Sequence, residues 1–228
     1  HERSDSFAQT RTCNLMSRRR AFIWSLPALL YVTFMGWYTD FGGPLRKTEI
    51  DHYAATLTEQ GRPPASVARI RQFMENDSGR QFFMLNAIDY AENPPDVPGA
   101  APGESATQLM DRYMEHMFRE LFKRGCHPAM MGNAIHTAID LVGVDGLGNA
   151  DTWDMGAFFR YRSRRTFMEI ITIPATKERH AFKVAALEKT FAYPVETEIN
   201  LADPRVLLGF MLLSAAGLLD LALVRPKL

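Results

Sequence analysis

The sequence predicts an α+β domain inserted between two transmembrane helices, and three observations lead to this fold class. Two apolar stretches, Ala21–Tyr38 and Val206–Val224, lie near the two ends of the 228-residue chain. Each is close to the roughly 20 residues that a helix needs to cross the hydrocarbon core of a bilayer. Between them, short strand-like runs alternate with amphipathic helical segments, which is typical of a domain that combines a sheet with helices.

The balance of charges excludes one class of partner. Lys plus Arg and Asp plus Glu each number 26, so the formal net charge is zero. Nucleic-acid binding relies on a basic field around the protein, which this composition does not supply. We therefore expect a lipid bilayer and other proteins as partners, and no nucleic acid.

Charged residues that flank the apolar stretches set the expected orientation. Arg18–Arg20 precede the first stretch and Asp40 follows it, whereas Arg225 and Lys227 follow the second. Because short loops rich in Lys and Arg stay in the cytoplasm, both termini are expected there. The middle domain is then periplasmic, with the chain in a bacterial inner membrane. A cleaved signal peptide is the alternative for the first stretch, but no small-residue cleavage pattern follows Tyr38, so we expect an uncleaved anchor.

The expected segments follow one another in a simple order. The polar start, His1–Leu15, has no helical or strand periodicity and is expected to lack regular structure. Capping signals and apolar spacing predict a helix from Thr48 to Gly61 and another over Pro64–Asn76, which together form a helical hairpin. The boundaries are a cytoplasmic tail 1–20, a transmembrane helix 21–38, a helical linker 39–79, the domain 80–200, a transmembrane helix 204–224 and a cytoplasmic tail 225–228.

The middle domain contains four strand-like runs. Gln81–Tyr90 is apolar on both of its alternating faces and is expected to be covered on both sides. Glu104–Arg124 is an amphipathic helix that ends before a glycine. The later elements are strands over Pro128–Val142 and Thr152–Tyr161, a helix from Ser163 to Pro174, a helix over Lys177–Lys189 and a strand over Phe191–Val195. This order of strand, helix, strand, strand, helix, strand is that of a ferredoxin-like βαββαβ domain.

Helices that lie on one face of such a sheet leave its other apolar face uncovered, and the sheet of a second copy would cover it. Phe82–Tyr90, the Arg112–Arg124 helix and Tyr161–Tyr193 resemble the dimeric α/β-barrel superfamily, and in particular its small uncharacterised bacterial members. The last of these segments carries Pro174, His180, Lys183 and Leu187. The resemblance covers roughly residues 80–197 and implies a homodimer with a pocket between sheet and helices. The superfamily includes monooxygenases, isomerases and haem-handling enzymes, so the resemblance does not select one activity.

Four polar residues are candidates for lining such a pocket: Asn86, Tyr113, Tyr161 and His180. Asn86 shares a strand face with apolar neighbours, and a buried amide must be hydrogen-bonded either to the protein or to a bound molecule. His180 lies near the pocket mouth that the resemblance implies. Aromatic packing in the core explains the two tyrosines equally well.

Two further groups of charged residues are candidates for contacts. Arg160, Arg162, Arg164 and Arg165 surround Ser163 at an expected helix start, where they favour contact with an anion, lipid head groups or a partner protein. A solvated surface is the alternative for them. Asp220 lies within the second apolar stretch, and the cost of an acid in lipid predicts that it pairs with another group. No metal-ligand spacing and no catalytic motif is present, so we expect no metal site, and no cofactor is implied.

Two functions from different classes follow from these patterns. The first is a non-catalytic accessory subunit of a bacterial membrane complex of the respiratory or photosynthetic type, which docks through its outer domain and its helices. The alternative is a membrane-anchored enzyme, carrier or sensor that binds a small hydrophobic or haem-like molecule in the barrel pocket. A domain interior filled by side chains would count against the alternative.

Overall fold

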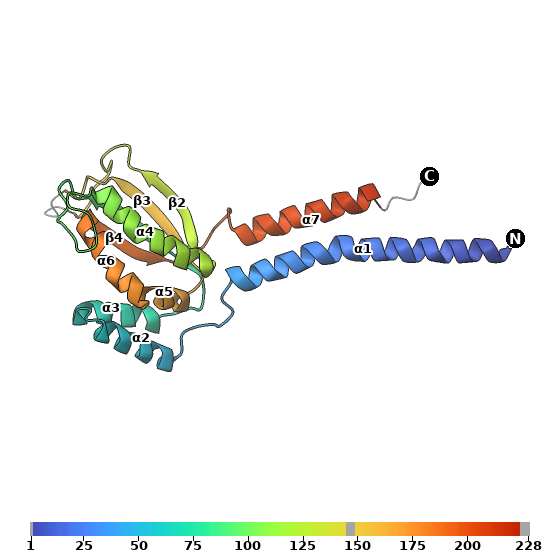
Figure 1. Ribbon diagram of the computed structural model, residues 1–228, viewed down its shortest axis with the longest axis horizontal. Coiled ribbons are helices and arrows are strands. Elements are labelled where there is room, and N and C mark those ends of the chain that lie inside the picture. Colours follow the sequence, from blue (N-terminus) through green and yellow to red (C-terminus); the bar gives the residue numbers. More distant parts are fainter. Residues whose placement is uncertain (1, 145–148, 224–228) are drawn as a thin grey trace. The chain divides into compact units, whose positions relative to one another are not determined.

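The structure is a computed structural model that describes residues 2–144 and 149–223, with side chains from residue 18 onward. Seven helices and four strands make up this described part of the chain (Figure 1). They belong to two compact units: Tyr38–Glu198 forms one, and His1–Trp37 with Ile199–Leu228 forms the other.

The second of these units consists of two helices, α1 (Glu2–Tyr38) and α7 (Pro204–Leu223). Arg18–Tyr38 and Pro204–Leu223 are long and apolar enough to span a membrane, by length and composition. Almost none of their side chains is buried. The expectation of an irregular N-terminal tail is wrong, because α1 begins at Glu2. Starting a helix is the costly step, and each residue added to an existing helix gains a hydrogen bond, so the apolar stretch extends into the polar one.

Two contacts within this unit join the helices. Arg20 Nε donates to Asp220 Oδ1 at 3.0 Å. The ring of Tyr31 comes within 3.4 Å of the place where a Cβ atom would stand on Gly209. The earlier residue of α1 meets the later residue of α7, so the two helices run antiparallel. Asp220 is therefore paired within the chain, as an acid in an apolar helix should be.

A four-stranded antiparallel sheet is the centre of the unit Tyr38–Glu198. Its strands are β1 (Phe82–Tyr90), β2 (His127–Asn133), β3 (Met155–Tyr161) and β4 (Leu187–Val195). Their order in the sheet is β2-β3-β1-β4, so the first strand in the sequence lies between the last two. The prediction of a mixed α+β domain is confirmed.

Three helices cover one face of this sheet: α4 (Ala106–Lys123), α5 (Arg164–Ile171) and α6 (Pro174–Ala186). Figure 1 shows α4 and α6 lying over the strands. Ser105 and Ser163 begin α4 and α5 by accepting hydrogen bonds from the backbone N–H groups of Gln108 and Thr166, which would otherwise be unpaired. The core between sheet and helices includes Phe82, Leu109, Met117, Leu121, Ala157, Tyr161, Ile170 and Ala186.

The expected helical hairpin is present as α2 (Lys47–Glu59) and α3 (Pro64–Glu75). Leu57 of α2 and Met74 of α3 are buried together with Met168 of α5, in a second apolar cluster. Burial of about 25 cal/mol per Å² of apolar surface is what holds such a hairpin in place. The hairpin is thereby part of the domain and packs beside the helices that cover the sheet.

Several element boundaries differ from the sequence prediction, and two of them have a clear physical reason. The strand expected over Pro128–Val142 ends at Asn133, where its partner β3 begins at Met155 and no strand remains to pair with. The helix expected over Lys177–Lys189 begins at Pro174 and ends at Ala186. The residues that follow Ala186 pair instead with the end of β1, so pairing between distant strands overrides the local helical pattern.

Candidate functional site

The four residues predicted to line a pocket all line one cavity, of about 300 Å³, between the sheet and its helices. Asn86 comes from β1, Tyr161 from β3, Tyr113 from α4 and His180 from α6. Strand residues two apart share a face, which brings the β1 and β3 side chains to the helix side of the sheet. The domain interior is therefore not filled by side chains at this place.

Most of the other residues that line the cavity are apolar. Four of the wall residues are methionines, whose flexible thioether side chains adapt to irregular shapes. The apolar residues that line it are Ile70, Met84, Ile88, Met110, Met114, Met117, Leu121, Phe159, Phe167, Ile171 and Ala192. Such walls suit a molecule that is itself mostly apolar.

The two tyrosines bring hydroxyl groups to these walls. Burial raises the pKa of Tyr113 to about 12, and it raises the pKa of Tyr161 well above the usual value of a phenol. Both rings are therefore neutral near pH 7. Neither hydroxyl makes a hydrogen bond to the part of the chain that the structure describes. Each is thus available as a donor to a molecule in the cavity.

The side-chain amide nitrogen of Asn86 has hydrogen-bond partners within the protein. Its Nδ2 group donates to the carbonyl oxygens of Met84, at 3.0 Å, and Ala157, at 3.4 Å. Its own amide oxygen has no hydrogen-bond donor among residues 2–144 and 149–223. Hydrogen bonds within the protein therefore satisfy the amide nitrogen of Asn86, and the amide oxygen can accept a hydrogen bond from a bound molecule.

Lys183 lines the same cavity and was not predicted as a site residue. Its Nζ lies 5.7 Å from the centre of the Tyr113 ring, and within the described residues it has neither a hydrogen bond nor an ion pair. Burial, and then the charge of Arg62, lower the pKa of Lys183 below its usual range. The sequence does contain a signal for Lys183: it follows His180 by three positions, so both residues lie on the same face of α6.

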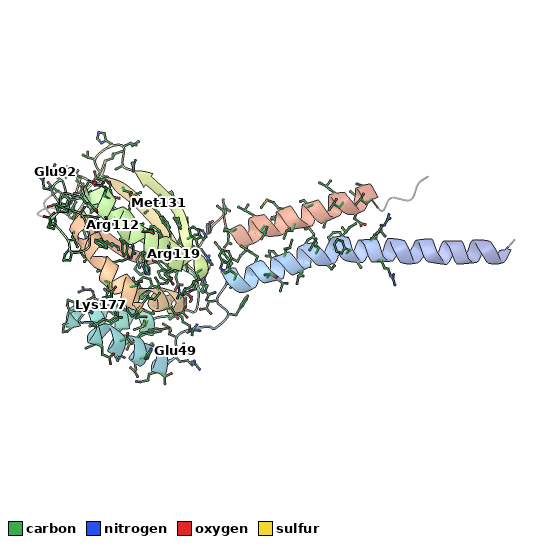
Figure 2. All side chains as sticks on the ribbon, in the orientation of Figure 1. Glu49, Glu92, Arg112, Arg119, Met131 and Lys177 are labelled. Atoms are coloured by element: carbon green, nitrogen blue, oxygen red, sulfur yellow. The ribbon has the colours of Figure 1, made fainter. Side chains whose placement is uncertain are left out.

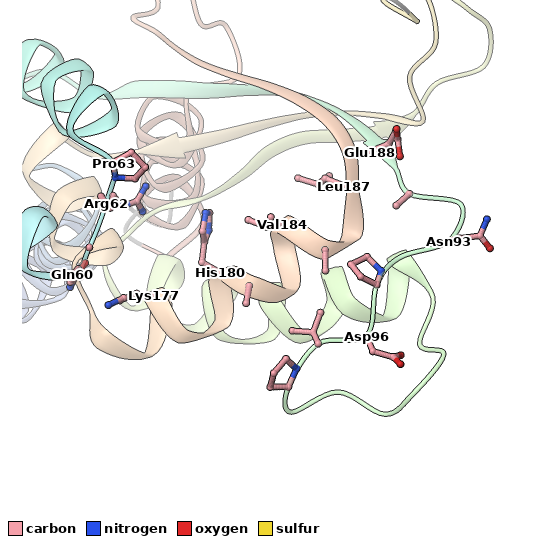
Figure 3. A pocket seen from close by; sticks show the side chains of 17 residues that line it. Gln60, Arg62, Pro63, Asn93, Asp96, Lys177, His180, Val184, Leu187 and Glu188 are labelled. Atoms are coloured by element: carbon pink, nitrogen blue, oxygen red, sulfur yellow. The ribbon is translucent and has the colours of Figure 1, made fainter.

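His180 stands at the mouth of the cavity. Its ring meets the Tyr113 ring edge-on, with centroids 6.2 Å apart. Burial lowers the pKa of His180 to about 4, with help from the charges of Lys183 and Arg62, so the imidazole is neutral near pH 7. Arg62 and His180 also line a wide surface groove of about 730 Å³, and Figure 3 shows them extending into the same space from the α2–α3 connection and from α6.

The cavity has basic groups but no acidic ones. Arg62 at the mouth and Lys183 inside are cationic or cation-forming, whereas none of the described lining residues is an aspartate or glutamate. Because Coulomb interactions are stronger where water is excluded, even a partial positive charge in such walls has a large effect on what binds there. The chemistry of the site is that of hydrogen-bond donors and positive charge inside an apolar enclosure.

The predicted arginine cluster has a structural role in this fold. Arg160 is 1% exposed, and its guanidinium donates to Gln81 Oε1 at 2.8 Å, to the Gly125 carbonyl at 2.7 Å and to the Tyr38 carbonyl at 2.9 Å. The same group lies over the Tyr38 ring, 3.5 Å from its centre. Arg160 therefore ties the start of the domain to the end of α4 and to β3.

The other three arginines also contact oxygens of the same unit. Arg165 Nε pairs with Glu49 Oε1 at 2.9 Å, and this contact lowers the pKa of Glu49 to about 2. Arg164 bridges Glu196, at 2.7 Å, and the Phe73 carbonyl, at 2.6 Å. Arg162 Nε donates to Thr166 Oγ1 at 3.0 Å. The cluster joins α2, α3 and β4 to α5, and these intrachain contacts leave it little capacity for an external anion.

Comparisons with known proteins give a limited result. No family model matches the sequence, and no curated protein matches it. Among solved structures, the RPA0582 protein of unknown function from Rhodopseudomonas palustris is 18% identical, covers 61% of this chain and 96% of its own, and has a TM-score of 0.48. A methylated form of RPA0582 is 18% identical, covers 62% of this chain and 96% of its own, and has a TM-score of 0.49. The At3g17210 protein from Arabidopsis thaliana is 15% identical, covers 53% of this chain and 99% of its own, and has a TM-score of 0.33.

Proposed function

We propose that this chain is a membrane-anchored protein whose domain binds a small, mostly apolar molecule in the cavity, as a carrier, a sensor or an enzyme. One observation carries the proposal. Polar groups of Asn86, Tyr113, Tyr161, His180 and Lys183 converge from two strands and two helices on a mostly apolar cavity. A well-formed apolar pocket with a few convergent polar groups and shifted pKa values is the usual form of a ligand site.

The size of the cavity narrows the ligand class. Ligand pockets range over about 300–1,000 Å³, and about 300 Å³ lies at the lower end of that range. This favours a small molecule over one as large as haem. The four methionines in the wall allow some adjustment of shape, so a family of related small molecules fits the site better than a single rigid one.

The arrangement of the sheet supports a more specific fold. Four antiparallel strands in the order β2-β3-β1-β4, with helices after β1 and after β3, support a ferredoxin-like βαββαβ domain. We infer that this domain is of the dimeric α/β-barrel type, flanked by two transmembrane helices. In such a dimer the uncovered faces of two sheets pack together, and each copy keeps its own pocket on the helix side.

The membrane assignment rests on the two exposed apolar helices of the second unit. Each of the two spans is only 6% buried, and the mean hydropathy is 1.3 in Arg18–Tyr38 and 2.2 in Pro204–Leu223. Lipid is the environment that best accommodates such exposed apolar helices. Arg18–Arg20 at the start of the first span favour cytoplasmic termini and a periplasmic domain, in a bacterial inner membrane.

Filling the cavity should abolish ligand binding. In Met114→Trp the indole is expected to occupy the space, because Met114 is a half-buried wall residue of α4. The full chain is extracted from native membranes, and native mass spectrometry records any small molecule that stays bound. Met131→Trp is the matched control, since Met131 lies on β2 outside the cavity (Figure 2). We expect a bound small molecule in the wild type and in the control, and none in Met114→Trp. Equal retention in all three would contradict a cavity ligand.

A second candidate function is supported by a different surface. The face of the sheet away from the helices carries exposed apolar side chains, including Met130, Phe191 and Tyr193, which are 60%, 54% and 51% exposed. Large exposed apolar side chains gathered on one face favour an interaction site there. A non-catalytic accessory subunit of a membrane complex, docked through this face and through its helices, accounts for it, and so does a homodimer.

Charging this face should separate the associated copies or subunits. In Tyr193→Lys an ammonium replaces an exposed aromatic ring of the proposed interface, and its desolvation is expected to weaken association at least a hundredfold. Phe122→Lys is the control, because Phe122 is 50% exposed on α4, a helix of the covered face. The mass of the detergent-solubilised particle, measured by light scattering, reports the outcome. A wild-type particle that contains a single copy and no other protein would rule out both forms of docking.

A further inference from the structure

We propose that the molecule in the cavity ends in a single carboxylate, for which Lys183 supplies the counter-charge. This inference rests on the proposed ligand-binding function and names the chemical class of its ligand: an apolar tail that carries one acidic head group.

The first argument is the position of Lys183. A lysine amine that is partly withdrawn from water has three hydrogen-bond donors when protonated and is usually paired. Lys183 lines the cavity, and its Nζ lies over the face of the Tyr113 ring, 5.7 Å from the ring centre. Within the described residues, it has no hydrogen bond and no ion pair. Contact with an aromatic face offsets only part of the free energy that a cation loses when water is removed from it, and an anion would offset the rest. An acidic ligand completes the pair.

The second argument is the set of groups that line the cavity together with Lys183. Tyr113 on α4 and Tyr161 on β3 are neutral donors, His180 on α6 is neutral, and Arg62 adds a positive charge at the mouth. A carboxylate has two oxygens with about four acceptor positions, so an ammonium and two phenols match one head group. The absence of an acidic side chain among the described lining residues means that nothing in the wall repels it.

The third argument is the apolar remainder of the wall. A ligand with two or more charges would leave some of them against methionine, leucine and phenylalanine side chains, at the cost of desolvation. A single acidic group at the basic end, with a hydrocarbon remainder toward Met84 and Phe159, avoids that cost. Each methylene buried against these walls is expected to tighten binding about fourfold until the cavity is full.

Octanoate and octan-1-ol are suitable probes, because they have the same chain and differ only in the acidic group. The full chain in lipid nanodiscs is titrated with each probe by calorimetry, and empty nanodiscs of the same lipid correct for partition into the bilayer. We expect octanoate to bind the wild type at least tenfold more tightly than octan-1-ol. Charge-assisted hydrogen bonds inside a protein account for a difference of this size.

Two matched variants place the acid within the cavity. Lys183→Met removes the amine and keeps the length of the side chain, and it should weaken octanoate binding about tenfold to a hundredfold while octan-1-ol binds as before. Lys177→Met is the control, because Lys177 is an exposed lysine of the same helix that lines the outer groove (Figure 3) and not the cavity. It should change neither affinity.

The outcomes separate this inference from the proposed function. If octan-1-ol and octanoate bind equally, and Lys183→Met weakens neither, the cavity binds apolar molecules but the carboxylate is wrong. If Lys177→Met weakens octanoate binding as much as Lys183→Met, the head group lies in the outer groove and the inference is also wrong. If neither probe binds the wild type above the empty nanodiscs, the proposed function fails together with the inference.

Discussion

Replacement of Arg160 by methionine should lower the free energy of unfolding of the domain by about 3–5 kcal/mol, because three acceptors lose their donor and each buried acceptor left unsatisfied costs about 1–3 kcal/mol. The guanidinium is 1% exposed and donates to the Tyr38 and Gly125 carbonyls and to Gln81. Methionine fills a similar length but leaves these acceptors buried without donors. It also removes the contact with the Tyr38 ring.

The measurement is a denaturant or thermal unfolding curve of the full chain in detergent. Arg119→Met is the control, since the Arg119 side chain is 74% exposed on α4 (Figure 2) and its pair with Glu115 is long, at 3.9 Å. A change within about 0.5 kcal/mol is expected there, as for most surface substitutions. If Arg160→Met unfolds at the same point as the control, then Arg160 does not hold the segment at Tyr38 to the domain.

The second expected effect has the opposite sign. Lys183→Met should stabilise the ligand-free domain by about 1–2 kcal/mol near neutral pH, because Lys183 is half-buried and replacing a charged group in the protein interior by an apolar one of similar volume is commonly stabilising. Burial lowers the pKa of Lys183 in the folded state, whereas the unfolded chain keeps the ordinary value of about 10.4. Between these two values the unfolded chain holds more protons than the folded one. Stability contributed by this residue therefore rises with pH across that window.

The gain from Lys183→Met should accordingly be largest below the folded-state pKa and should shrink as the pH approaches about 10. Thermal unfolding at a series of pH values compares it with the wild type and with Lys177→Met, which should follow the wild type throughout. A destabilised Lys183→Met would mean that the amine is paired in the folded protein, and a gain that does not depend on pH would mean that its pKa is not lowered by folding. A residue that costs stability and improves binding is the mark of a functional site.

Local patterns predicted much of this domain. The alternation in Phe82–Tyr90 and the helical spacing in α4 were sufficient, because each repeats over two or more turns or pairs within one segment. The same periodicity placed Asn86, Tyr113 and Tyr161 on inward faces, and the cavity that they line with His180 follows from packing those faces together. Lys183 was missed because a lysine on an amphipathic helix is normally assigned to the solvated side.

The two apolar stretches, the inward faces of the strands and helices, and the α+β class were determined by the sequence alone, since each depends on the spacing of apolar residues within one segment. The tertiary structure decided where β2 and α6 end, what the four arginines contact, and that an unpaired amine lies inside the domain. These features depend on which distant segments meet. A strand ends where its neighbour ends, and a charged side chain is surface or core according to what packs over it.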